Sequence, residues 1–316
     1  MDAAVVRELG QAPEFGQFDE PVPGDGEVLI TVKAAALNPS TKATASGAHY
    51  ASQKQVPFVV GLDGVGVLED GKRVFFGGPR APFGTFAQKA VAHQARCWPI
   101  PDDVDDVTAA AIPNPALSSW LPMVHQARVE PGQTVLVLGA TGTAGKLAIQ
   151  IAKLLGAGRV VAAGRNEEIL ATLPELGADA TIQLDQPQEQ LVKAFSAEPG
   201  FHTVLDFVWG KPTEALLAAL TRPDFDADSF ATKIVQIGEG AGPTITLPAA
   251  ALRSAGLTIV GTGMPPFQLF LDTFGKAMEY AANGTLKVDT APTHLSEITT
   301  VWHEGDKNGK RVVIIP

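Results

Sequence analysis

Hydrophobic residues follow one pattern in the first third of the chain and another in the middle. Before residue 106, short β-branched or aromatic runs are separated by glycine and proline, as at 28–33, 65–68 and 72–76. Such runs are typical of short strands joined by turns. We therefore expect a compact, mostly antiparallel β module in this part, followed by Ala/Leu-rich helical sequence.

The middle of the chain alternates apolar runs with segments whose hydrophobic residues recur at helical spacing. Residues 135–138 (Val-Leu-Val-Leu) are fully apolar, and residues 143–155 have the helical spacing. Further units follow at 159–163 with 167–176, 180–183, 202–208 with 214–220, 233–237 and 257–260. This alternation predicts a parallel sheet covered by helices on both faces. The tail predicts a helix over 268–282 and a final strand over 311–315.

Length and charge narrow the class of protein. The 316 residues suggest two domains, at about 100–200 residues per domain. Hydrophobic residues make up 45% and charged residues 18%, which is typical of a folded globular protein. The 24 Lys and Arg against 34 Asp and Glu give a formal net charge of −10. An acidic chain is poorly suited to nucleic acid or an anionic membrane, so we expect neither as a partner.

The single cysteine, Cys97, excludes an intrachain disulfide and indicates a reducing compartment. The first eight residues have no basic stretch before a sustained apolar run, so we expect no signal peptide. No apolar run approaches the roughly 18 residues that a membrane span needs. We therefore expect a cytoplasmic protein.

A glycine-rich turn joins the strand predicted over 135–138 to the helix after it. The turn consists of Gly139, Ala140, Thr141, Gly142, Thr143, Ala144 and Gly145. It has the form A-x-G-x-x-G, in which Gly142 lets the backbone approach a pyrophosphate and Gly145 lets helix and strand pack closely. The N–H groups of the helix start would hold the anion. We predict a dinucleotide site; the alternative is a tight turn without a ligand.

The end of the second strand predicts which dinucleotide binds. An NAD site has a carboxylate there, which accepts hydrogen bonds from the ribose hydroxyls. This chain has Gly164, Arg165 and Asn166 instead, with no acid before Glu167. An arginine can hold a 2′-phosphate through its planar set of donors, and Asn166 can add another. We therefore predict NADPH; a solvated arginine at a helix start is the alternative.

Several short motifs, in their order and spacing, identify a family resemblance. They lie at 36–39 (Ala-Leu-Asn-Pro), 61–66 (Gly-Leu-Asp-Gly-Val-Gly), 84–87 (Gly-Thr-Phe-Ala), 109–113 (Ala-Ala-Ala-Ile-Pro), 176–179 (Leu-Gly-Ala-Asp) and 309–313 (Gly-Lys-Arg-Val-Val). With the glycine turn, they make the chain resemble the zinc-free quinone oxidoreductase branch of the medium-chain dehydrogenase/reductase (MDR) superfamily, over nearly its whole length.

This resemblance implies an α/β fold in which a Rossmann doubly wound parallel sheet is inserted into a GroES-like, mostly-β catalytic domain. The expected domains are residues 1–117 with 262–316, which form the substrate domain, and residues 118–261, which bind the dinucleotide. The resemblance also implies a substrate cleft between the domains, over the nicotinamide. Family members are commonly homodimers that pair the last Rossmann strand, here 257–260.

The side chains that could bind zinc also indicate which branch of the superfamily the chain resembles. Superfamily alcohol dehydrogenases use thiolate and imidazole ligands for a catalytic zinc ion, and four cysteines for a structural one. Their Gly-His-Glu corresponds here to Gly61, Leu62 and Asp63, so the histidine ligand is missing. One cysteine cannot build the structural site, and Cys97 is expected to be a packing residue. We predict no metal.

Three residues are the candidates for polarising the substrate. Asn38 matches the family asparagine beside the nicotinamide; the alternative is a turn residue before Pro39. Ser118 falls where the family usually has threonine; the alternative is a helix serine that bonds to its own backbone. Tyr50 could donate from the cleft, with His49 beside it; the alternative is a surface-loop tyrosine.

Further cofactor contacts are expected from Gly238 and Gly261 at later strand ends, where plain turns are the alternative. Two positions depart from the family pattern. Thr41 replaces an aspartate, and Leu184 replaces a tyrosine that often helps hold the 2′-phosphate.

Taken together, the motifs predict an NADPH-dependent, zinc-independent oxidoreductase that transfers hydride to a quinone or an α,β-unsaturated carbonyl. Two alternatives are a non-catalytic NADPH-binding sensor or structural protein and an enoyl-thioester reductase of the same superfamily. A short-chain dehydrogenase is rejected because the pair Tyr50 and Lys54 precedes the glycine turn, in a β-rich segment.

Overall fold

A computed structural model of the chain describes residues 1–47, 52–221, 231–304 and 309–316. The chain forms two compact units, one made of Met1–Asn114 with Ala277–Pro316 and the other of Pro115–Lys276. The divisions therefore fall at 114/115 and 276/277, whereas the sequence prediction places them at 117/118 and 261/262. The second division lies inside helix α9 (Phe267–Ala282). The hydrophobic pattern of a continuous helix does not show where one unit ends and the other begins.

The first unit is built on mostly antiparallel strands; β15 and β16 pair in parallel. Its larger sheet has the order β15-β16-β3-β5-β6-β8, with β7 also paired to β3, and a smaller sheet has the order β2-β1-β4. The strands are β1 (Asp2–Val6), β2 (Glu14–Gln17), β3 (Glu27–Ala36), β4 (Phe58–Val59), β5 (Asp63–Leu68), β6 (Arg73–Gly77), β7 (Lys89–His93), β8 (Cys97–Pro99), β15 (Thr290–His294) and β16 (Arg311–Ile315). The predicted β module is confirmed.

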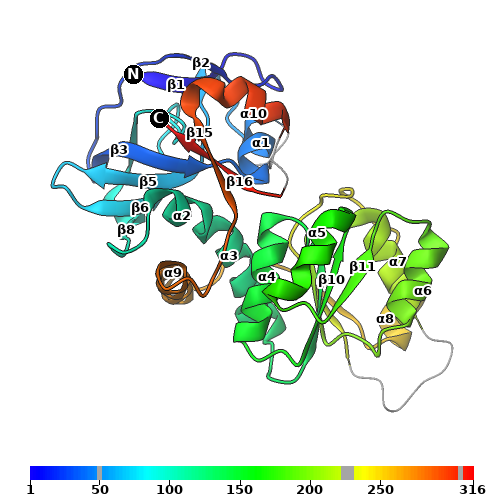
Figure 1. Cartoon of the computed structure of the whole chain (residues 1–316). Helices are drawn as coiled ribbons and strands as arrows, with labels where there is room; N and C mark the ends of the chain where they lie inside the picture. Colours follow the sequence, from blue (N-terminus) through cyan, green and yellow to red (C-terminus); the bar gives the residue numbers. More distant parts are fainter. Residues whose placement is uncertain (48–51, 222–230, 305–308) are drawn as a thin grey trace. The chain divides into compact units, whose positions relative to one another are not determined.

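Both chain ends contribute to this unit (Figure 1). Strand β16 pairs antiparallel with β3, with Val313 opposite Ala36 and Ile314 opposite Ala35. Ala35 and Ile314 are fully buried in one hydrophobic core, together with Phe86. Burial of these apolar side chains stabilises the pairing of two segments that lie far apart in the sequence. Helices α1 (Pro39–Ala45), α2 (Asp106–Ala111) and α10 (Ile298–Glu304) complete the unit.

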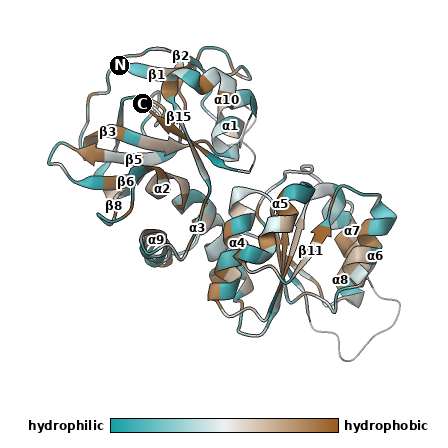
Figure 2. Cartoon of the chain, viewed as in Figure 1, coloured by the Kyte–Doolittle hydropathy of each residue, from teal (hydrophilic) through white to brown (hydrophobic). Residues whose placement is uncertain are grey.

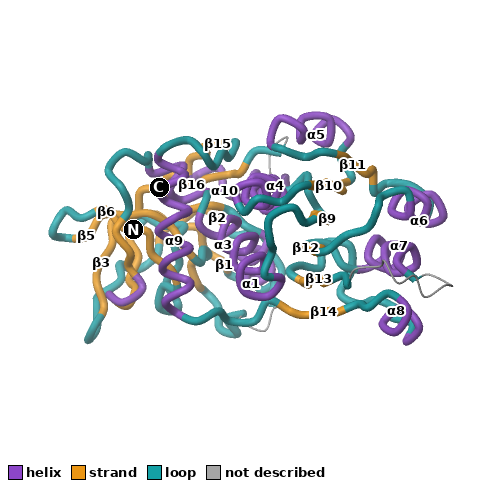
Figure 3. The backbone as a smooth tube through the Cα atoms, turned by 90° about the horizontal axis from the view of Figure 1, so that it is seen from below, coloured by secondary structure: helices purple, strands orange, loops and turns teal. Residues whose placement is uncertain are grey.

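The second unit is a Rossmann fold. Its six parallel strands have the order β11-β10-β9-β12-β13-β14, which can be followed across the sheet in Figure 3. They are β9 (Thr134–Leu138), β10 (Arg159–Gly164), β11 (Ala180–Gln183), β12 (Thr203–Asp206), β13 (Lys233–Gln236) and β14 (Thr258–Gly261). The sequence order reverses between β9 and β12, where open α/β sheets bind ligands at the carboxyl ends of the strands.

Helices cover both faces of this sheet, as predicted. In Figure 1, α4 (Thr143–Leu154) and α5 (Glu167–Thr172) lie on one side, and α6 (Gln188–Ser196), α7 (Gly210–Leu220) and α8 (Ala249–Ser254) lie on the other. Figure 2 shows apolar and polar residues on different sides of these helices. Helix α3 (Pro113–Leu121) includes residues on both sides of the division at 114/115. None of the helices in the described ranges is both long and apolar enough to cross a bilayer.

Local chemistry moves some predicted boundaries. The strand expected over 202–208 ends at Asp206, because its carboxylate accepts the N–H groups of Val208 and Trp209 and so turns the chain. The helix expected over 167–176 changes to a 3₁₀ turn at Leu173, beside Pro174. A proline has no N–H to continue the α-helical bonding pattern.

Candidate functional site

The glycine turn lies between β9 and α4, at the carboxyl edge of the Rossmann sheet. The N–H groups of Gly139 and Ala140 donate to the carbonyl of Ala163, each at 2.9 Å, so the turn is tied to the neighbouring strand β10. Gly139 has φ +93°, a conformation that favours glycine. Gly142 is the N-cap of α4 and provides no side chain to cap it.

The space around the turn differs between Gly142 and Gly145. A Cβ atom on Gly145 would lie 2.3 Å from the carbonyl oxygen of Gly139, so a side chain is excluded there. A Cβ atom on Gly142 would meet only that same oxygen, at an ordinary 3.5 Å. Gly142 is exposed, while Ala140 is buried beneath the turn. The helix start therefore presents backbone to open space, as anion sites of this kind require.

The other turn residues have different surroundings. Thr143 is buried, whereas Thr141 and Ala144 are half-buried. The carbonyl oxygen of Ala144 accepts a hydrogen bond from the Ser119 hydroxyl at 2.8 Å. The neighbouring residue Ser118, which we predicted as a catalytic donor, donates to the carbonyl of Pro115 at 3.0 Å. Its hydroxyl is thus used within its own helix, and its catalytic role stays a prediction.

The end of β10 carries the residues predicted to select the cofactor. A Cβ atom on Gly164 would lie 2.4 Å from Cγ2 of Thr141, so the glycine turn packs directly on this strand end. Arg165 is exposed, and its carbonyl oxygen accepts from Nε2 of Gln183 at 2.9 Å. Asn166 caps α5 through Oδ1, which accepts the N–H of Ile169 at 3.0 Å. Its amide nitrogen, a donor, is not used in that cap.

Across the reversal point, Asp206 organises the next strand end. Its carboxylate accepts from the N–H groups of Val208 and Trp209 at 3.0 and 2.7 Å, and from the Thr213 hydroxyl at 2.5 Å. Burial raises the pKa of Asp206, against these hydrogen bonds, which lower it. Trp209 has φ +55°, an uncommon conformation for any residue with a side chain.

Gly238 and Gly261 end neighbouring segments of the same edge. A Cβ atom on Gly238 would lie 2.7 Å from the carbonyl oxygen of Phe207, so packing requires this glycine. Gly261 has open space around its Cα. Their contacts with a cofactor stay predictions.

In the first unit, Asn38 is the N-cap of α1, with Pro39 as the first helical residue. Its Oδ1 accepts from the backbone N–H of Thr41 at 2.7 Å and from the Thr41 hydroxyl at 2.9 Å. Asn38 is only 2% exposed, and its Nδ2 has no acceptor among the described residues. Tyr50, the third predicted catalytic residue, and His49 lie outside the described residues.

Asp63 lies at the start of β5, in the segment compared above with zinc-dependent relatives. Its Oδ2 accepts from Nδ2 of Asn114 at 3.4 Å, and its Oδ1 has no donor among the described residues. Burial raises the pKa of Asp63 to about 6, although Arg311 and Asn114 act to lower it. The sequence analysis did not pair Asp63 with Arg311, because the two residues lie far apart along the chain.

The donors do not fit a zinc site in the described part of the chain. No group of three His, Cys, Asp or Glu residues is close enough there to hold a metal ion. Burial raises the pKa of the Cys97 thiol to about 11, as expected of a packing residue.

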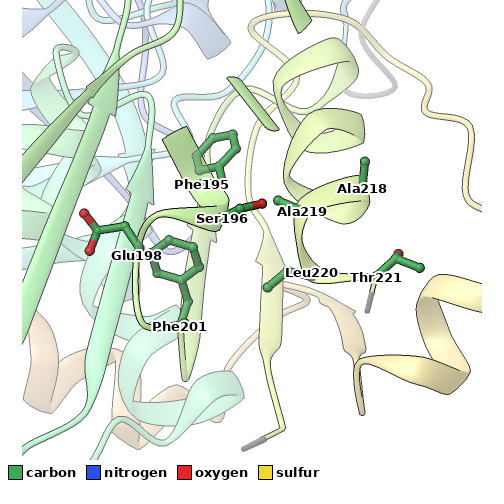
Figure 4. A pocket seen from close by; sticks show the side chains of 9 residues that line it. Phe195, Ser196, Glu198, Phe201, Ala218, Ala219, Leu220 and Thr221 are labelled. Atoms are coloured by element: carbon green, nitrogen blue, oxygen red, sulfur yellow. The ribbon is translucent and has the colours of Figure 1, made fainter. Parts of the chain in front are cut away.

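A cavity of about 350 Å³ lies at the opposite edge of the Rossmann sheet (Figure 4). Phe195 and Ser196 at the end of α6 line it, together with Phe201 before β12 and Leu220 at the end of α7. Glu198 also lines the cavity, and its carboxylate forms a salt bridge with Arg159 at 2.9 Å. The cavity is therefore at the amino ends of the strands and is separate from the glycine turn.

Two family models match the chain. The alcohol dehydrogenase GroES-like domain matches residues 24–102, and the zinc-binding dehydrogenase family matches residues 144–281. The first match falls on the β module, and the second covers most of the Rossmann unit and the end of α9.

Known proteins resemble the chain over all or most of its length. The "Probable NADPH-dependent quinone reductase tdiC" of Emericella nidulans is 26% identical, and the alignment covers all of both chains. Quinone oxidoreductase-like protein 2 of Rattus norvegicus is 26% identical, with 91% of this chain and 83% of that protein covered. The quinone oxidoreductase of Thermus thermophilus, solved alone and with NADPH, is 28% identical, with a TM-score of 0.77 and all of both chains covered.

Proposed function

Because the chain belongs to the quinone oxidoreductase branch of the MDR superfamily, we propose that it is an NADPH-dependent oxidoreductase that reduces a quinone or an α,β-unsaturated carbonyl without zinc. The observation that carries this proposal is the turn between β9 and α4. Packing excludes a side chain at Gly145, while open space faces Gly142 at the start of the helix. This combination suits a dinucleotide pyrophosphate.

Candidate residues of this chain match three parts of NADPH. The turn residues 140–145 would bind the pyrophosphate through backbone N–H groups. Arg165, exposed at the end of β10, would bind the 2′-phosphate, and the amide nitrogen of Asn166 would add a donor. Gly261, which has open space around its Cα, would leave room for the nicotinamide half, and Gly238 would present backbone beside it. When bound, NADPH supplies the hydride.

The chain must stabilise negative charge on the substrate oxygen during hydride transfer. Asn38 is the best candidate in the described residues, because its buried Nδ2 has no acceptor there. Ser118 and Tyr50 are further candidates. Independence from zinc is supported by Leu62 at the position of a histidine ligand and by the single cysteine of the sequence.

We also propose a homodimer that forms through β14. This strand ends the Rossmann sheet within the described residues. Near it, Met264 is 92% exposed and Phe267 is 63% exposed, which is unusual for large apolar side chains. Light scattering should give twice the chain mass for the wild type. Met264→Glu with Phe267→Glu should give a monomer, and a wild-type monomer would refute the dimer.

NADPH oxidation by the purified protein tests the activity. A simple para-quinone, a simple enone and an enoyl thioester should be supplied in parallel, with and without a chelator. Turnover of the quinone or the enone, unchanged by the chelator, supports the proposal. A preference for the thioester would identify the related enoyl-thioester reductase. NADPH binding without turnover of any acceptor would favour a sensor.

A further inference from the structure

We propose that Thr41 is a positioning residue that orients the Asn38 amide so that its Nδ2 faces the carbonyl oxygen of the acceptor substrate. The inference rests on the reductase function proposed above and adds a residue to it. Thr41 and Asn38 both lie in the first unit, at the start of α1, where they are 1% and 2% exposed.

The orientation of the Asn38 amide follows from the chemistry of its partner. The two ends of an asparagine amide have nearly the same shape, so contacts must decide which is oxygen. The backbone N–H of Thr41, 2.7 Å away, can only donate. The atom that it faces must therefore be the oxygen, Oδ1, and Nδ2 must point to the opposite side.

The hydroxyl of Thr41 gives the same orientation a second contact. It lies 2.9 Å from Oδ1 and donates to it. Two hydrogen bonds from one residue leave the amide less freedom to rotate than the N-cap bond alone. A carboxylate at position 41 would act in the opposite way, because it accepts hydrogen bonds and would attract Nδ2 toward α1.

The unused end of the amide is the second observation. Nδ2 is buried and has no acceptor among the described residues. A buried donor without a partner is unfavourable, so native structures rarely contain one without a reason. A carbonyl oxygen is an acceptor of suitable chemistry, and its demand for a donor grows as negative charge develops during hydride transfer.

Four variants test the role of Thr41. Thr41→Val removes the hydroxyl and keeps the shape and the backbone N–H, and Thr41→Ser restores the hydroxyl. Asn38→Asp keeps an acceptor for Thr41, and so the cap of α1, but has no Nδ2 to donate. The fourth variant combines Thr41→Val with Asn38→Asp. For each, kcat and KM are measured with the preferred acceptor, alongside the midpoint of thermal unfolding.

We expect Thr41→Val to lower kcat about 5- to 20-fold with a smaller change in KM, and Thr41→Ser to retain wild-type kcat within about twofold. Asn38→Asp should lower kcat/KM about 100-fold. Adding Thr41→Val to Asn38→Asp should cause no further loss of kcat, since no donor remains to be oriented. A purely structural role would instead lower the unfolding midpoint in both backgrounds.

The inference would be overturned by an active wild type whose Thr41→Val variant keeps its kcat, or by the same loss of kcat in the Asn38→Asp background. Either result leaves the reductase function standing. A wild type that binds NADPH and reduces none of the acceptors overturns the proposed function, and this inference with it.

Discussion

A Cβ atom on Gly145 would lie 2.3 Å from the carbonyl oxygen of Gly139, so the first turn of α4 packs directly on the backbone that follows β9. A Cβ atom on Gly142, three residues earlier, would lie 3.5 Å from the same carbonyl oxygen, which is an ordinary contact. The two glycines therefore lack side chains for different reasons. Gly145 is needed for packing within the protein, and Gly142 leaves space outside it.

Substitution at these two glycines should separate stability from cofactor binding. Gly145→Ala should lower the free energy of unfolding by about 1–3 kcal/mol, because the methyl group forces backbone to move. Gly142→Ala should lower it less, by about 0.5–1 kcal/mol, because alanine is a poorer N-cap than glycine. Gly142→Ala should nevertheless weaken NADPH binding about tenfold or more, because the added methyl group would occupy space in the proposed pyrophosphate site. Urea denaturation and fluorescence titration with NADPH measure the two effects. Unchanged NADPH affinity in Gly142→Ala would contradict the proposed pyrophosphate site.

Arg165 should control the choice between NADPH and NADH. A charge-assisted hydrogen bond contributes about 1.5–3 kcal/mol, so Arg165→Ala should weaken NADPH binding about 10- to 100-fold. NADH binding should change little, because NADH has no 2′-phosphate. Arg253→Ala is the matched control, since it removes an exposed arginine from α8 in the same unit. Equal losses for both cofactors would place Arg165 outside the 2′-phosphate site.

Asp63 should give the protein a pH-dependent stability. Burial raises the pKa of Asp63 to about 6 in the folded state, compared with an ordinary value of 3.8. The folded state therefore keeps a proton that the unfolded state releases, and the resulting stability is full below pH 3.8 and is lost as the pH rises through 6. The loss amounts to about 3 kcal/mol at 1.36 kcal/mol per pH unit.

Urea denaturation between pH 4 and 8 tests this linkage. Relative to Asp63→Asn, the wild type should lose stability as the pH rises, and the difference should level off above about pH 6. The comparison uses the slope with pH, because Asp63→Asn also changes the contacts of this buried position at every pH. Asp102→Asn, at an exposed position of the same unit, is the control. Parallel curves for the wild type and Asp63→Asn would refute the raised pKa.

Asp206 should stabilise the strand end beside the glycine turn. Asp206→Ala leaves two backbone N–H groups and the Thr213 hydroxyl without their acceptor, so we expect a loss of about 2–4 kcal/mol in the free energy of unfolding. Thr213→Val removes only one of the three hydrogen bonds and should cost about 1 kcal/mol. Chemical denaturation compares the two variants. Equal losses would show that the bonds to Val208 and Trp209 add little.

Repeating local patterns explain how much of the fold was predictable. The apolar run of β9, the glycine turn and the helical spacing of α4 are each local, and all three lie where the sequence predicted them. The ends of strands and helices were less predictable where a side chain bonds to the backbone. The carboxylate of Asp206 ends β12 early, and α7 begins at Gly210, four residues before the predicted helix start.

The Rossmann unit, the β module and the candidate phosphate turn could all be predicted from the chain alone, because hydrophobic spacing and glycine positions are properties of neighbouring residues. Which distant groups meet became visible only in the folded chain. Folding pairs β16 with β3 and brings Arg311 into the electrostatic range of Asp63. It also sets the direction of the Asn38 amide, which residue type alone leaves open. Such contacts depend on how the whole core closes, since burial determines both which charges interact and which hydrogen-bonding groups lose water.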